Sequence, residues 1–100
     1  YDHCWVIDKK AGEIALAARL YSPESGRVLE VWTDQPGIQF YAGNFFDGKT
    51  VVKNGKPVNF REALALEAQN FPDSPNHPNF PSARLNPGEV YTNVCIYKFL

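Results

Sequence analysis

The sequence contains no methionine and only two cysteines and two histidines among its 100 residues. Cys4 and Cys95 lie near opposite ends, each in an apolar run. Two positions do not define a disulfide, so a bridge stays open and two buried free thiols are the simpler expectation. No Cys/His spacing fits a zinc site. This sparing use of cysteine favours the cytoplasm, and leaves a periplasmic or secreted location open.

Long apolar runs and clusters of basic residues are also missing. No segment approaches the roughly 20 apolar residues of a membrane-spanning helix, and no signal peptide opens the chain. The formal net charge is −1, without the grouped Lys and Arg that phosphate binding needs. We therefore expect neither a membrane nor a nucleic acid as partner. The chain also lacks a P-loop, a dinucleotide-binding fingerprint and a nucleophile elbow.

What the sequence does contain is a series of short strand-like segments separated by turn signals. Turns are indicated at 22–26, 35–37 and 86–89, and the loop 45–57 has room for a small hairpin. The segment 14–21 also permits a helix, but its setting between turns favours a strand. The pattern predicts an antiparallel all-β sandwich of roughly seven strands, the clearest being 3–8, 14–21, 27–34, 38–42, 63–69 and 90–100.

Several of these strands are apolar on both faces, as in Trp5-Val6-Ile7 and Val28-Leu29. Strands covered on both sides need more protein than 100 residues supply. The chain also begins at Tyr1 rather than at a methionine. We therefore expect this chain to be one part of a larger sandwich, with further sequence upstream.

Glu67 is the first candidate for chemistry. On a strand, Ala63, Ala65, Glu67 and Gln69 share one face, so small side chains lead up to a carboxylate and an amide. Such a face can admit a ligand, with Glu67 as a general base or a hydrogen-bond acceptor. An edge-strand glutamate facing water is the alternative.

Four further polar residues could also contact a ligand. Gln39 lies among aromatic residues on its strand, as in sugar-binding surfaces, although a satisfied amide at a sheet edge fits the pattern equally well. Asp2 and His3 are adjacent and therefore face opposite ways, so they cannot both serve one ligand. His77, in the proline-rich run 71–81, is interpreted as a surface residue.

The sequence resembles the aldose 1-epimerase (galactose mutarotase) family. Six blocks occur in the family's order over essentially the whole chain, which corresponds to the family's C-terminal third. These blocks are Tyr1-Asp2-His3, Ser25–Val31, Gln35–Tyr41, Gly43-Asn44-Phe45, Leu66–Asp73 and Leu85–Tyr91.

The resemblance implies a large antiparallel β-sandwich, an open sugar site on one sheet, and no cofactor. It implies that Glu67 is the catalytic base and that Asp2 and Gln39 contact the sugar. The substrate would be a free aldohexose such as galactose or glucose, interconverted between its α and β anomers. The family's acid and its second catalytic histidine belong to an upstream segment, so that segment is an expected partner of this chain.

Two departures from the family pattern are visible. Ala68 replaces a threonine next to Glu67, but position 68 belongs to the opposite face of the strand. The run Arg61-Glu62-Ala63 replaces one that often contains a histidine, which can alter the rim of the site. Two other functions stay open: a non-catalytic carbohydrate-binding sandwich, and a mutarotase for a hexose 6-phosphate that would use basic residues such as Arg61 and Arg84.

Overall fold

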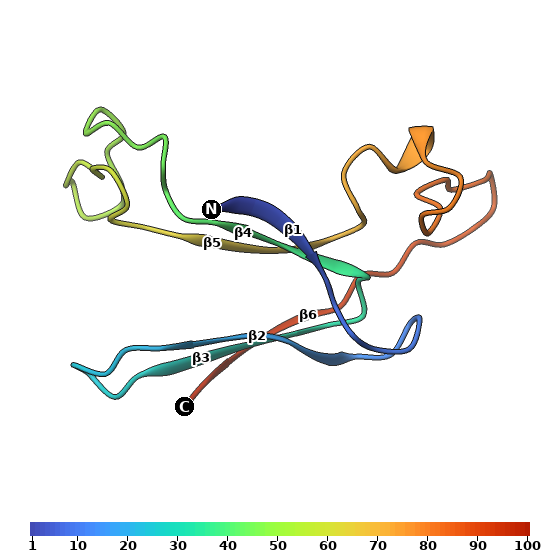
Figure 1. Ribbon diagram of the computed structural model, residues 1–100, viewed down its shortest axis with the longest axis horizontal. Coiled ribbons are helices and arrows are strands. Elements are labelled where there is room, and N and C mark those ends of the chain that lie inside the picture. Colours follow the sequence, from blue (N-terminus) through green and yellow to red (C-terminus); the bar gives the residue numbers. More distant parts are fainter.

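The computed structural model describes residues 1–100 as an all-β chain with two three-stranded antiparallel sheets (Figure 1). A single 3-10 helix, η1 (Ser74–Asn76), follows the fifth strand. The chain has no helix with the length and apolar character that a membrane crossing requires. The strands are β1 (Asp2–Val6), β2 (Ala15–Tyr21), β3 (Val28–Thr33), β4 (Gly37–Tyr41), β5 (Ala65–Gln69) and β6 (Cys95–Phe99).

The two sheets form two layers. The first sheet has the order β1-β4-β5 and the second the order β2-β3-β6. The tight connection from β3 to β4 crosses between them at Asp34-Gln35-Pro36. In Figure 1 the first sheet is the upper layer, and the segments before and after β5 rise beyond it at opposite ends of the strands. These two segments therefore flank the face of the first sheet that points away from the second.

The core between the layers is small. It is built on Ile7, Val31 and Ile38, with Leu29 and Leu66 packed against them. Only 9 of the 100 residues are buried, so this chain covers much less of its apolar surface than a self-contained domain of its length. The sequence predicted strands that are apolar on both faces. In this chain the apolar side chains of one such strand, Trp5 and Val6, are exposed.

The six predicted strands all occur, including the one over 14–21, but the last is much shorter than expected. Residues 90–94 were predicted to be strand and are not, because β3 ends at Thr33, which pairs with Cys95. Beyond that pair no strand is available as a partner for residues 90–94. In the loop 45–57, the small hairpin is reduced to one bridge between Val51 and Pro57.

The last strand is exposed along its whole length. Tyr97 pairs with Val31, whose side chain is fully buried in the core, so Tyr97 and its neighbour Phe99 belong to the inner face of the sheet. The first sheet does not extend over them, and Phe99 is 78% exposed. The expectation of two buried thiols is wrong for Cys95: both cysteines are free, but Cys95 is exposed and only Cys4 is partly covered.

Candidate functional site

The sequence-predicted site residues come together on the first sheet. Cys4 pairs in register with Gln39, and Gln39 pairs with Glu67, so these three side chains form one row across β1, β4 and β5. Asp2 belongs to the adjacent row, opposite Tyr41. Paired residues share a face. The outer face, as we call the side away from the core, consists of Asp2, Cys4, Val6, Gly37, Gln39, Tyr41, Ala65, Glu67 and Gln69.

Asp2 and Gln39 are in direct contact. The side-chain Nε2 of Gln39 donates a hydrogen bond of 2.8 Å to Oδ1 of Asp2. The carbonyl oxygen of the same amide, Oε1, is buried and has no hydrogen-bond partner. Buried acceptors are nearly always satisfied in folded proteins, so an orphaned one marks a position where a further donor belongs.

Glu67 lies at the centre of β5 with its side chain exposed. Its neighbours along the strand on the same face are Ala65, which has a small side chain, and Gln69. Leu66 and Ala68 point to the core side, and Leu66 packs against it. A carboxylate with access to solvent and a small neighbour can take up and return a proton from a bound ligand.

Two hollows of the chain are lined by residues other than Asp2, Gln39 and Glu67. One of about 340 Å³ lies between the sheets and is lined by apolar side chains, among them Trp5 and Leu66. Another, of about 420 Å³, lies in the loop after β5 beside His77 and Arg84. Asp2, Gln39 and Glu67 therefore form an open surface of the sheet in this chain, and not a closed pocket.

Two residues of the outer face, Cys4 and Tyr41, were not predicted from the sequence to belong to the site. Cys4 stands beside Gln39, and burial raises the pKa of its thiol, an effect partly offset by a hydrogen bond from Gln69. Tyr41 stands beside Asp2, and its hydroxyl accepts a hydrogen bond of 2.9 Å from the backbone N–H of Phe45. The alternation of each strand, counted from Asp2 or Gln39, is the signal that would have found them.

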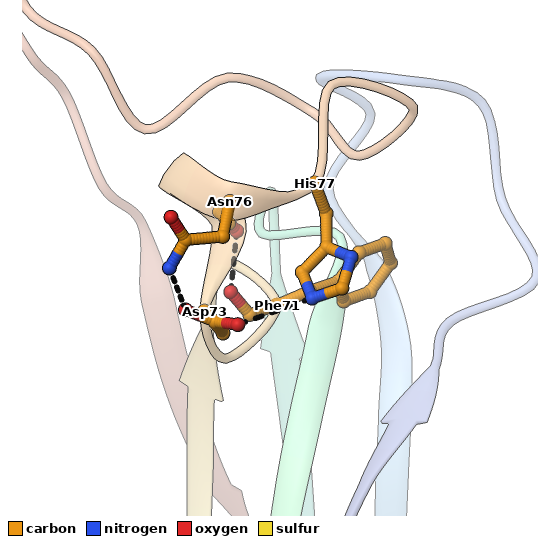
Figure 2. A network of polar contacts seen from close by, with 5 residues as sticks. Phe71, Asp73, Asn76 and His77 are labelled. Carbon is orange, nitrogen blue, oxygen red and sulfur yellow. Dashed lines mark hydrogen bonds and ion pairs between the residues drawn. The ribbon is translucent and has the colours of Figure 1, made fainter.

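The loop after β5 is folded on itself (Figure 2). Asp73 adopts a left-handed conformation with φ of 60°, and its carboxylate accepts a hydrogen bond of 2.5 Å from Asn76 and lies 3.1 Å from Nε2 of His77. The ring of Phe80 stacks on His77 and meets Phe71 edge to face. These contacts hold the proline-rich segment against the end of β5.

Neither histidine belongs to the outer face. His77 is bound to Asp73 in the loop with its side chain about half exposed, which confirms the interpretation as a surface residue. His3 pairs with Phe40 on the core side of the sheet, beside the rings of Tyr1 and Trp5. The prediction that Asp2 and His3 face opposite ways is therefore confirmed, and His3 is not available as an acid for Glu67.

Comparison with known proteins shows which family this chain resembles. The family described as "Aldose 1-epimerase" matches residues 1–98. The chain is 48% identical over 99 residues to galactose mutarotase of Mus musculus and 46% identical over 99 residues to that of Homo sapiens, in each case 99% of this chain. It is 38% identical to aldose 1-epimerase of Escherichia coli over an alignment of 102 positions that covers the whole chain.

The chain spans about 29% of the length of these curated relatives. The family match spans β1 to β5 and most of β6, so it covers every strand that builds the outer face. Both the family match and the identities extend over nearly all of the chain. This chain belongs to the aldose 1-epimerase family.

Proposed function

We propose that this chain is the C-terminal portion of an enzyme that interconverts the α and β anomers of a free aldohexose. The carrying observation is that Asp2, Gln39 and Glu67, from three different strands, stand together on one open sheet face. Carboxylates and amides are hydrogen-bond partners for sugar hydroxyls. Galactose or glucose is the expected substrate, since relatives of this chain are named galactose mutarotase.

The proposed reaction needs one base and one acid. Glu67 removes the proton from the anomeric hydroxyl, while an acid delivers a proton to the ring oxygen as its bond to C1 breaks. The open-chain aldehyde rotates about the C1–C2 bond and closes on the other face. In the closing step the ring hydroxyl returns its proton to the acid, and Glu67 returns its own to the new anomeric oxygen.

Asp2 and Gln39 have the binding role in this proposal. Their hydrogen bond holds Asp2 to Gln39, and Gln39 stands in the same row as Glu67. A sugar lying on the outer face would meet the Asp2 carboxylate as an acceptor for its hydroxyl protons. Holding the sugar in one orientation places its anomeric hydroxyl at Glu67, which is worth several orders of magnitude in rate.

The acid comes from an upstream segment, which completes the site. Within this chain the outer face is open, Glu67 is exposed, and His3 lies on the other side of the sheet. The upstream segment therefore has two tasks, to bring the acid to the ring oxygen and to close the sugar off from water. This requirement makes the chain by itself inactive.

The alternative substrate, a hexose 6-phosphate, would need basic residues at the site, and the positions of Arg61 and Arg84 do not favour it. The Nε of Arg61 donates a hydrogen bond of 3.0 Å to Asn44, and its guanidinium lies over the ring of Phe60. Arg84 lines the hollow beside His77, which contains none of the outer-face residues. The free sugar is therefore the substrate we propose.

The test is to follow optical rotation after adding freshly dissolved α-galactose or α-glucose to this chain joined to its upstream segment. We expect the joined protein to accelerate mutarotation, and Glu67→Gln to lower kcat by about 10²–10⁴-fold, the usual contribution of a general base. Glu24→Gln, an exposed glutamate in the turn after β2, is the matched control and should leave kcat unchanged. Near-normal turnover of Glu67→Gln would remove Glu67 from the mechanism.

A further inference from the structure

The side-chain oxygen of Gln39, Oε1, has no role in the sugar binding proposed for Asp2 and Gln39. The Nε2 of Gln39 is used, because it donates to Asp2 at 2.8 Å. Its Oε1 is buried and has no partner. A carboxylate accepts hydrogen bonds and donates none when ionised, so Asp2 fixes which arm of the amide faces it. The amide of Gln39 is thereby locked with its oxygen directed away from β1.

The neighbour on the other side of Gln39 is Glu67. The two residues are direct partners in the β4–β5 register, on the same face. Side chains in such a pair start from Cβ atoms about 4.5–5.5 Å apart, which is within reach of a hydrogen bond between an amide and a carboxyl group. Gln39 therefore lies between two carboxyl groups on neighbouring strands. Its amide N–H donates to Asp2 on one side, and its amide oxygen is left for Glu67 on the other.

The partner that suits Oε1 changes with the protonation of Glu67. An ionised Glu67 is only an acceptor and cannot satisfy another acceptor. A protonated Glu67 carries one O–H, which Oε1 can accept. We propose that Gln39 is a positioning residue for the base: its Oε1 accepts a hydrogen bond from Glu67 once Glu67 has taken the anomeric proton.

This inference rests on the proposed function and adds a step to it. The O–H bond of the anomeric hydroxyl breaks, its electron pair forms the C1 carbonyl, and the C1–O5 pair moves to the ring oxygen, which gains a proton from the upstream acid. The anomeric proton is then on Glu67, and its hydrogen bond runs to Oε1 of Gln39. The contact exists only after proton transfer, so it favours the open-chain state over the bound ring.

The inference predicts which kinetic constant changes. Gln39→Met keeps the length of the side chain but removes both arms of the amide. We expect kcat to fall about tenfold, the effect of one net hydrogen bond, while KM stays within about threefold. Glu24→Gln, in the turn after β2 and away from the outer face, is the control; its kcat should stay within about twofold of wild type.

The orientation of the amide is tested by a double-mutant cycle. Asp2→Asn frees the Gln39 amide to turn its nitrogen towards Glu67. We expect Asp2→Asn to lower kcat by a larger factor when Gln39 is present than in the Gln39→Met background, where only the contact of Asp2 with the sugar remains to be lost. An equal loss in both backgrounds, or a Gln39→Met enzyme with raised KM and normal kcat, overturns the inference.

Two further measurements distinguish a failure of this inference from a failure of the proposed function. The first is the activity of Glu67→Gln. If Glu67→Gln retains activity, both the proposed base and the proposed role of Gln39 are wrong. If Glu67→Gln is inactive but Gln39→Met has a normal kcat, only the proposed role of Gln39 is wrong. Thermal unfolding of each variant checks that it is folded. If Gln39→Met does not fold, Gln39→Asn, which withdraws the amide by one methylene, must lower kcat at constant KM; a normal kcat then contradicts the inference.

Discussion

Cys4 of β1 and Gln69 of β5 contact one another across the strand that separates them. The Gln69 Nε2 lies 3.9 Å from the Cys4 Sγ. The contact passes over Gly37 of β4, where a Cβ would come within 2.9 Å of that sulfur and 3.0 Å of the Phe71 ring. The absence of a side chain at Gly37 thus lets the two edge strands of the sheet, and the loop after β5, meet at one point beside the candidate site.

Gly37→Ala should therefore destabilise the protein. The contact with the sulfur is closer than real Cβ atoms show, and the contact with the ring is tighter than most of them, while that ring is itself held by Phe80. We expect a loss of about 1–3 kcal/mol in the free energy of unfolding, as for other overpacked sites, measured by denaturant titration. Cys4→Ala combined with Gly37→Ala should recover part of the loss. Strictly additive effects would show that the sulfur is not what the new methyl group meets.

Cys4 should report on sugar binding. Its thiol is partly covered and has a raised pKa, whereas Cys95 is exposed, so a thiol-specific reagent at neutral pH should modify Cys95 first. Because Cys4 is in the same row as Gln39 and Glu67, saturating sugar should slow its modification further. Mass spectrometry of the two cysteine peptides over time measures both rates. Equal protection of Cys95, or none of Cys4, would contradict the placement of the sugar on the outer face.

Asp34 should contribute stability that depends on pH. Hydrogen bonds from the Gln35 side chain, at 2.9 Å, and from the Val94 N–H, at 3.0 Å, hold the pKa of Asp34 below its ordinary value. The unfolded state then binds more protons than the folded state in acid, so the contribution is complete above pH about 4 and is lost as the pH falls through the folded pKa.

Asp34→Asn should accordingly flatten the acid limb of the stability profile. The difference in unfolding free energy between wild type and variant should shrink between pH 5 and pH 2, as followed by urea unfolding at each pH. Asp8→Asn, an exposed aspartate after β1 with no hydrogen bond or ion pair through its side chain, is the matched control. A constant difference across this range would show that Asp34 acts through packing and not through its charge.

The isolated chain should bind a hydrophobic dye. Its inner face at Tyr97 and Phe99 is uncovered, and large contiguous apolar patches on folded proteins are sites of association. We expect anilinonaphthalene sulfonate fluorescence to rise with residues 1–100 and to fall when the upstream segment is joined. Phe99→Ser should reduce dye binding without loss of strand content by circular dichroism. Dye binding that is unchanged by Phe99→Ser would place the exposed apolar surface elsewhere.

The faces of the strands could be predicted from the sequence, because alternation needs no knowledge of neighbours. Leu66 and Ala68 point to the core side, while Ala65, Glu67 and Gln69 point outward, as the spacing indicated. The register could not be predicted. Nothing in the order of residues says that Gln39 stands opposite Glu67, since that pairing is set by how the whole of β4 lies on β5.

The ends of strands were predicted less well for a related reason. A strand ends where its partner ends, and partners are set by the tertiary fold. Val94 has strand-like neighbours, yet its backbone carbonyl accepts a hydrogen bond of 2.7 Å from the Thr33 hydroxyl and its N–H donates to Asp34. The exposure of Cys95 was missed for the same cause, because the run around it is apolar but nothing in this chain packs over it.

The order of strands has a consequence for how the molecule forms. The sheet with the candidate site needs only residues 2–69, whereas the second sheet places β6 against β3 and joins residues some 60 positions apart. Pairings so distant in sequence are slow to find, and within this chain β6 is made after the other five strands. The strands that present Asp2, Gln39 and Glu67 are thus all available before β6, the strand that completes the layer beneath them.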